Sequence, residues 1–173
     1  MNLPQPSPEA LEQSGHLVAH LRRLIEGQGG WISFATYMAE ALYTPGLGYY
    51  SGGARKFGPG GDFITAPELT PLFGQAIASQ VQQIMELSAP HIIEAGAGTG
   101  LLAADLLLEL EVRGSLPESY AILEVSGELR ERQFDTIATK VPHLASRVSW
   151  LEGLPEHFSG ALVANEVLDV MPV

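Results

Sequence analysis

The sequence contains no cysteine among its 173 residues. Disulfide bonds and metal sites built on thiolates are therefore excluded. Basic residues are also scarce: 9 Lys and Arg stand against 20 Asp and Glu, which leaves a formal net charge of −11. This charge repels a phosphate backbone, whose binding normally needs clustered Lys and Arg. We therefore expect no nucleic-acid partner, and a basic protein suits the chain better as a substrate.

The chain also lacks long apolar runs and the pattern of a secretory signal. Its longest apolar stretches fall short of the roughly 20 residues that span a bilayer, so we expect no membrane contact. Residues 1–9 show neither a basic segment nor an apolar signal core. Together with the absence of cysteine, this pattern predicts a cytoplasmic protein. The length and the 46% share of hydrophobic residues fit a soluble globular protein with one core.

Glycine, in contrast, is abundant, and its most informative cluster lies at residues 94–100. An apolar strand ends there in an acid and continues as Ala-Gly-Ala-Gly-Thr-Gly before a helical run. Glycines at the carboxyl end of a first strand let a ligand lie against bare backbone, because a Cβ would collide with it. The candidate cofactor-binding residues of this turn are Glu94, Ala95, Gly96, Ala97, Gly98 and Gly100.

Three interpretations of this glycine turn stay open at this point. A dinucleotide-binding turn usually has its third glycine after two intervening residues, and Leu101 occupies that position here. The spacing Glu-x-Gly-x-Gly-x-Gly is instead similar to motif I of class I S-adenosylmethionine-dependent methyltransferases. A methyl-donor site is therefore favoured over a nicotinamide or flavin site. A purely structural turn between a strand and a helix is the third alternative.

The chain divides into a helical amino-terminal part and an α/β part. Residues 1–13 contain three prolines and no sustained period, which predicts a mobile tail. Residues 14–88 are predicted to form a helical extension, since their apolar residues repeat at helical spacing. The glycine-rich segment at 51–62 interrupts it and is either a lid over a ligand or an ordinary connector. Residues 89–173 are expected to form the α/β part.

Two polar residues follow that glycine-rich segment. Thr65 and Glu68 offer a hydroxyl and a carboxylate directly before a long helix. The start of that helix is predicted at Thr70 and Pro71, which suit an N-cap and a first helical position. We take Thr65 and Glu68 as candidate cofactor contacts, although Glu68 alone also suits the dipole of the helix.

Four strands predict a Rossmann-like sheet of the α/β class. They are expected at residues 92–93, 120–125, 148–151 and 161–164. Glu124 stands 24 residues beyond Gly100, at the end of the second strand. In nucleoside-binding folds a carboxylate at this place accepts hydrogen bonds from both ribose hydroxyls. A surface glutamate is the alternative, and Val125 beside it completes the predicted cofactor contacts.

The fourth strand determines the predicted order of the sheet. With the first three strands in order 3-2-1, the fourth must pair on the free side of the first strand, which gives 3-2-1-4. Asn165 and Glu166, directly after the fourth strand, should then face the glycine turn. With Asp169 they are the candidate catalytic residues, which would hold a methyl acceptor. The alternative is that Asn165 and Asp169 satisfy backbone groups of their loop.

Four segments together strongly resemble the MidA family of class I methyltransferases. They lie at residues 37–50, 61–68, 94–100 and 165–172. The segment Gly-Asp-Phe-Ile-Thr-Ala-Pro-Glu that ends at Glu68 is specific to this family, whereas the glycine motif is common to many methyltransferases. The resemblance extends from about residue 15 to the end. The family includes a mitochondrial complex I assembly methyltransferase, a protein arginine methyltransferase that acts on a respiratory complex subunit, and bacterial relatives.

The resemblance implies S-adenosylmethionine as cofactor, no metal, and protein arginine N-methylation. A guanidinium is protonated at neutral pH and presents a planar fork of donors, so a carboxylate can align it. Glu166 is the best candidate for that role, with Asp169 or Glu68 as a second acid. The partner is then a protein substrate, for which a respiratory complex subunit is one candidate.

The family sheet has more strands than the four expected here. A sheet that stops at its fourth strand leaves an unpaired edge, which folded proteins normally cover or pair. We therefore expect a missing carboxyl-terminal half or a second chain, such as another copy, that completes the sheet. Two other functions stay open: an S-adenosylmethionine-binding assembly or interaction module without catalysis, and a nucleotide-dependent oxidoreductase.

Overall fold

The computed structural model describes residues 5–52 and 64–173, which fall into two compact units. The smaller unit comprises the chain up to residue 54 together with Leu168–Val173, and the larger unit spans Arg55–Val167. The predicted glycine-rich loop at 51–62 lies outside the described residues from residue 53 onward. Within the described residues, no helix is long and apolar enough to cross a membrane.

Helix α1 of the smaller unit spans Pro8–Gly27 and begins earlier than the sequence analysis predicts. Residues 8–13, assigned to a mobile tail, are helical, so that prediction is wrong for them. The hydroxyl of Ser7 accepts a hydrogen bond from the Ala10 N–H at 3.2 Å and caps the helix. Proline is tolerated in the first turn of a helix, so Pro8 starts this helix instead of breaking it.

Helix α2, Phe34–Tyr43, follows the N-cap Ser33, whose hydroxyl accepts from the Thr36 N–H at 3.1 Å. Glu40 of this helix accepts a hydrogen bond from the Thr44 hydroxyl and lies 2.7 Å from His20 Nε2 on α1. The hydrogen bond from Thr44, then that from His20, hold the pKa of Glu40 below its usual value. These contacts tie α2 to α1.

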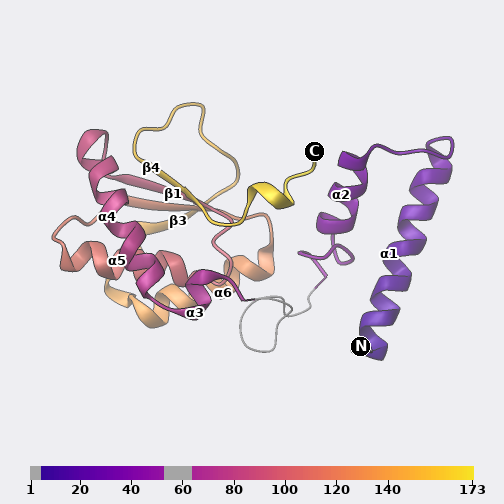
Figure 1. The fold of residues 1–173 in the computed structure, drawn as a ribbon, viewed down its shortest axis with the longest axis horizontal. Coiled ribbons are helices and arrows are strands. Elements are labelled where there is room, and N and C mark those ends of the chain that lie inside the picture. The colour runs from indigo at the N-terminus through magenta and orange to yellow at the C-terminus, as the bar shows by residue number, and fades with distance from the viewer. Residues whose placement is uncertain (1–4, 53–63) are drawn as a thin grey trace. The chain divides into compact units, whose positions relative to one another are not determined.

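The larger unit alternates helices with parallel strands. Its elements are α3 (Ala66–Leu69), α4 (Leu72–Leu87), β1 (His91–Ala95), α5 (Leu101–Val112), β2 (Ser119–Leu123), α6 (Gly127–Lys140), the 3-10 helix η1 (Pro142–Arg147), β3 (Val148–Leu151) and β4 (Ala161–Ala164). A further 3-10 helix, η2 (Leu168–Val170), belongs to the smaller unit. The sheet order is β3-β2-β1-β4 (Figure 1), which confirms the predicted α/β fold and strand order.

Helices α4, α5 and α6 lie on one side of this sheet (Figure 1). Alternate strand residues face them, because successive side chains of a strand point to opposite faces. Although the predicted extension, residues 14–88, includes α4, this helix packs in the larger unit. Gly74 allows α4 to approach α5 closely, since a Cβ there would lie 2.7 Å from Asp105 Cβ.

The start of α4 lies one residue later than predicted, with Pro71 as the N-cap and Leu72 as the first helical residue. The Thr70 hydroxyl accepts a hydrogen bond from the Leu72 N–H at 3.3 Å. Helix α3, directly before α4, was not expected, since four residues are too few to show a period.

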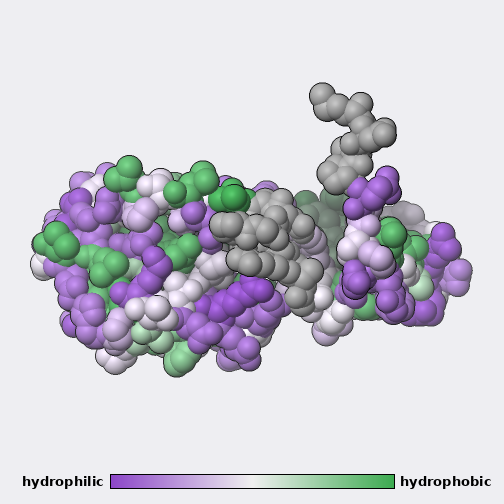
Figure 2. Space-filling model, turned by 90° about the horizontal axis from the view of Figure 1, so that it is seen from below, coloured by the Kyte–Doolittle hydropathy of each residue, from purple (hydrophilic) through white to green (hydrophobic). Residues whose placement is uncertain are grey.

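On the face of the larger unit seen in Figure 2, apolar residues lie in separate groups among polar ones. The glycine turn lies at the carboxyl edge of this parallel sheet, one face of which is covered by α4, α5 and α6.

Candidate functional site

The glycine turn connects β1 to α5 through three residues with left-handed backbone. Gly96, Gly98 and Gly100 have φ angles of 64°, 53° and 82°, which side chains rarely adopt. A Cβ on Gly96 would lie 2.8 Å from Val167 Cγ2, and one on Gly100 would lie 3.0 Å from Gln133 Cα. A Cβ on Gly98 would meet no atom within 4 Å. The turn is therefore packed on both flanks and open at its centre, where a ligand has room to approach the backbone.

Glu94 ends the buried part of β1 and is only 2% exposed. Its Oε2 accepts a hydrogen bond from the Tyr120 hydroxyl at 2.7 Å. Burial raises the pKa of Glu94 to about 7; the Tyr120 hydrogen bond opposes this shift and the charge of Glu124 adds to it. Burial also raises the pKa of Tyr120 well above its usual value. Glu94 is thus a carboxyl group that changes its charge near neutral pH.

Glu124 is the first residue after β2 and is 6% exposed. Its Oε1 accepts from the Ser126 N–H at 3.0 Å and its Oε2 from Gln133 Nε2 at 3.1 Å. Burial raises the pKa of Glu124, while hydrogen bonds, with that from Ser126 first, counteract it. The interpretation of Glu124 as an exposed surface glutamate is therefore excluded. Val125 beside it is 76% exposed and offers an apolar surface.

Gln133, on α6, joins Glu124 to the glycine turn and was not among the predicted site residues. Its Nε2 also donates to the Gly98 carbonyl at 3.0 Å, and its Oε1 accepts from Trp150 Nε1 at 2.8 Å. The signal lies in the helix period: Leu129, Gln133 and Ile137 stand four residues apart and are all buried. A glutamine in the middle of an apolar helix face requires hydrogen-bond partners in the core.

Thr65 and Glu68, the two cofactor contacts predicted before α4, differ in how they are placed relative to the glycine turn. Glu68 on α3 accepts a hydrogen bond from the hydroxyl of Thr99, so it lies beside the glycine turn. Thr65 is the residue before α3 and makes no side-chain capping bond to it. The structure therefore brings Glu68 to the turn through Thr99.

The residues after β4 meet the turn at the same sheet edge. β4 pairs with β1 in parallel, with Ala164 opposite Ala95, so the residues that follow both strands leave the sheet side by side. Val167 reaches Gly96, as the 2.8 Å approach above shows. Glu166 is exposed and has a φ of 54°, in the left-handed region. Asn165 is half-buried.

Asp169 is exposed in η2 and belongs to the smaller unit. The proposed catalytic roles of Asn165, Glu166 and Asp169 stay predictions.

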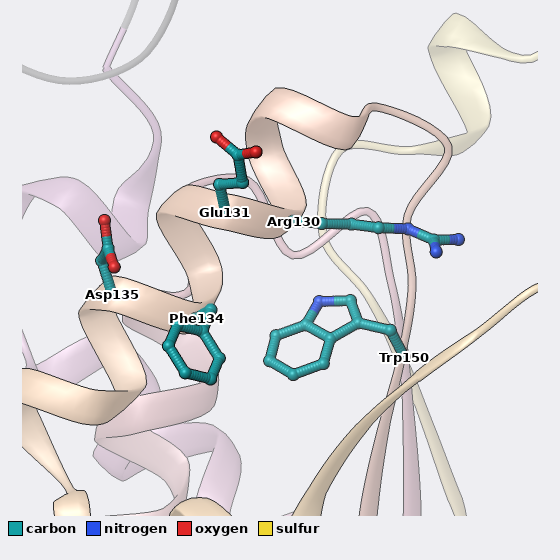
Figure 3. A pocket seen from close by; sticks show the side chains of 5 residues that line it. All are labelled: Arg130, Glu131, Phe134, Asp135 and Trp150. Atoms are coloured by element: carbon teal, nitrogen blue, oxygen red, sulfur yellow. The ribbon is translucent and has the colours of Figure 1, made fainter.

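A hollow of about 470 Å³ lies elsewhere, between α6 and β3. Figure 3 shows its lining, and none of the residues predicted for the site contributes to it. Its lining residues are Arg130, Glu131, Phe134, Asp135 and Trp150. The Trp150 ring borders the hollow while its N–H donates to Gln133, and Arg130, which also lines the hollow, donates to the Glu124 carbonyl.

Residues 72–173 match the model of a family described as "Putative S-adenosyl-L-methionine-dependent methyltransferase". The matched segment covers more than half of the chain and includes the glycine turn, Glu124 and the end of β4. The chain belongs to this methyltransferase family. The resemblance drawn from the sequence motifs is thereby confirmed.

Curated relatives of this methyltransferase chain carry arginine methyltransferase names. The chain is 32% identical over 201 residues to the mitochondrial protein arginine methyltransferase NDUFAF7 homolog of Drosophila melanogaster, a match that covers 100% of the chain and 45% of the relative. It is 33% identical over 193 residues to mitochondrial NDUFAF7 of Mus musculus, which covers 96% of the chain and 44% of that protein.

A solved structure agrees with these relatives. A COG1565 superfamily member from Burkholderia thailandensis, crystallised bound to S-adenosyl-homocysteine, is 53% identical to the chain with a TM-score of 0.93. The match covers 99% of the methyltransferase chain and 46% of that protein. The chain therefore spans less than half the length of these relatives.

Proposed function

We propose that this chain binds S-adenosylmethionine at the glycine turn and belongs to a protein arginine methyltransferase. The observation that carries the proposal is the buried Glu124 carboxylate, held beside the glycine turn by hydrogen bonds to both of its oxygens. A carboxylate has about four acceptor positions on its two oxygens, so Glu124 can accept hydrogen bonds from ribose hydroxyls in addition to those from the protein. The open centre of the turn at Gly98 and the exposed Val125 supply further surface for an adenosyl ligand.

Bound S-adenosylmethionine would supply an electrophilic methyl group on a sulfonium. The protein then has to orient the acceptor nitrogen towards that methyl group and exclude water. Among the residues after β4, Glu166 is the best candidate to align a guanidinium, because a carboxylate matches its planar fork of donors. Its left-handed backbone supports a functional role, since a non-glycine residue at such a φ costs about 1 kcal/mol or more.

The arginine acceptor is supported by the names of the relatives, and a basic acceptor suits the net charge of −11. A respiratory complex subunit as substrate is implied by the family resemblance alone. The predicted cytoplasmic location also stays a prediction, and the two relatives named above are mitochondrial proteins.

The proposal is tested by methyl transfer. Methyl-labelled S-adenosylmethionine is incubated with the chain, or with a full-length relative, and with lysate from a strain that lacks the corresponding gene; labelled methylarginine is then sought in hydrolysed protein. We expect Glu166→Gln to lower transfer at least about tenfold while S-adenosylhomocysteine affinity changes little. The exposed Glu156 provides the control, because Glu156→Gln removes the same charge from another loop.

If Glu166→Gln transfers methyl groups as fast as the unaltered protein does, Glu166 has no role in the mechanism. If the unaltered chain binds S-adenosylhomocysteine but transfers no methyl group under conditions in which the full-length relative is active, the chain is a cofactor-binding module and the transfer activity is contradicted for it.

A further inference from the structure

Gln133 is a fully buried amide whose hydrogen bonds reach three separate segments of the larger unit. They run to the glycine turn at Gly98, to Glu124 after β2, and to Trp150 on β3. A side-chain amide has two N–H donors, and both find an acceptor here. The side chain of Gln133 thus links the glycine turn to Glu124.

The amide has one orientation that satisfies all three partners. The Trp150 indole N–H only donates, so it must meet the amide oxygen. The Gly98 carbonyl only accepts, and both Glu124 oxygens accept hydrogen bonds here, so these two partners must meet the amide nitrogen. A rotation by half a turn would place the oxygen against two acceptors and the nitrogen against a donor. Trp150 therefore acts together with these two acceptors to fix where Gln133 presents its donors.

This orientation has a consequence for Glu124. Its Oε2 is held by Gln133 and its Oε1 by the Ser126 N–H, so the plane of the carboxylate is fixed by two donors. Two hydroxyls on adjacent carbons need two acceptors at a set spacing. Since Gln133 also holds the Gly98 carbonyl, one amide sets both the carboxylate and its distance from the turn.

We propose that Gln133 is a positioning residue for nucleoside binding: its amide, oriented by Trp150, holds Glu124 and the glycine turn in the geometry that an S-adenosyl ligand requires. The inference rests on the proposed binding of S-adenosylmethionine. Gln133 contacts Glu124 and the glycine turn, and it affects ligand binding through these two contacts.

The test measures the Kd of S-adenosylhomocysteine by calorimetry at pH 8 and pH 5.5, with circular dichroism to establish that each variant is folded. Gln133→Glu replaces the two donors with a carboxylate that faces Glu124 and Gly98. At pH 8 we expect its Kd to exceed that of the unaltered chain at least about tenfold. At pH 5.5 protonation supplies an O–H donor, and we expect the ratio to fall to about threefold or less.

Two further variants complete the design. Gln80→Glu adds the same charge at an exposed position of α4 and should keep the Kd ratio within about twofold at both pH values. Trp150→Phe keeps an aromatic ring but removes the donor that orients the amide, so we expect a Kd about threefold to tenfold higher, with no difference between the two pH values relative to the unaltered chain.

A folded Gln133→Glu variant with an unchanged Kd at pH 8, or with the same Kd ratio at both pH values, would overturn the inference. If Gln133→Glu does not fold, Trp150→Phe decides, and an unchanged Kd there would overturn it. Absence of binding by the unaltered chain contradicts the proposed function itself and the inference with it, so the two failures are distinguishable.

Discussion

At the residue scale, the three glycines of the turn share a left-handed backbone but differ in their surroundings. Gly100 lies against the backbone of Gln133, which is part of a helix and cannot move aside easily. Gly98 has open space around the position of a Cβ. The two positions therefore separate the cost of the backbone conformation from the cost of a steric clash.

We predict that Gly100→Ala lowers the free energy of unfolding by about 2–4 kcal/mol, because strain at positive φ adds to the approach of 3.0 Å to Gln133 Cα. Gly98→Ala is the matched control and should lose about 1–2 kcal/mol from strain alone. Urea unfolding followed by circular dichroism measures both losses. Equal losses for the two variants would show that Gln133 does not pack against the turn.

Glu94 gives the larger unit a dependence on pH. Its pKa is 4.5 in the unfolded chain and about 7 when folded, so between these values the folded state holds more protons. The free energy of unfolding should therefore fall as the pH rises from about 4.5 to 7, by up to about 3 kcal/mol. Glu124, whose pKa is also raised by burial, contributes in the same direction.

Glu94→Gln should remove most of this slope, because the glutamine still accepts from Tyr120 but carries no charge. Urea unfolding at pH 5, 6, 7 and 8 measures the effect, with Glu118→Gln at an exposed position as control. A slope that persists unchanged in Glu94→Gln would assign the pH dependence to another group.

At the element scale, Arg130 fixes α6 to the ends of two strands. Its Nε donates to the Glu124 carbonyl at 2.7 Å, its Nη2 to the Leu151 carbonyl at 3.0 Å, and its Nη1 lies 2.8 Å from Glu152 Oε1. Arg132 on the same helix makes an ion pair with Glu128 within α6 alone. The two arginines thus differ in whether they join separate elements.

Arg130→Lys should lower the free energy of unfolding by about 1–2 kcal/mol, because an ammonium group cannot reproduce the planar fork of donors. Arg132→Lys changes a partly buried pair within one helix and should cost less than about 0.5 kcal/mol. Thermal or urea unfolding compares the two. If both variants are equally stable, Arg130 does not hold α6 to β2 and β3.

The elements also show what the sequence can and cannot predict. The glycine turn follows from a local pattern and the strand order from the topology of α/β folds, and the structure has both. The start of α1 was missed because a proline suits both a mobile tail and a first helical turn. The helix period marks Gln133 as buried, but its partners lie 35 positions before it and 17 after it, and no local pattern identifies them.

At the scale of the whole molecule, the described residues form one sheet with helices α4–α6 on one side. Leu162 of β4 is exposed on the opposite face, and among the described strands only β1 pairs with β4. The relatives named above are more than twice as long as this chain, which covers 44–46% of each of them. Completion of the sheet by a carboxyl-terminal half or by another copy stays a prediction.

The central claim is that the glycine turn and Glu124 hold an S-adenosyl group. Calorimetric titration of the chain with S-adenosylhomocysteine and, separately, with NAD tests it most directly, with Glu124→Ala as the site variant and Glu128→Ala on α6 as the control. We predict one S-adenosylhomocysteine per chain, weaker or no binding of NAD, a loss of at least about tenfold in affinity for Glu124→Ala, and little change for Glu128→Ala. A folded chain that binds NAD more tightly, or whose Glu124→Ala variant binds S-adenosylhomocysteine as well as the unaltered chain does, would contradict the account.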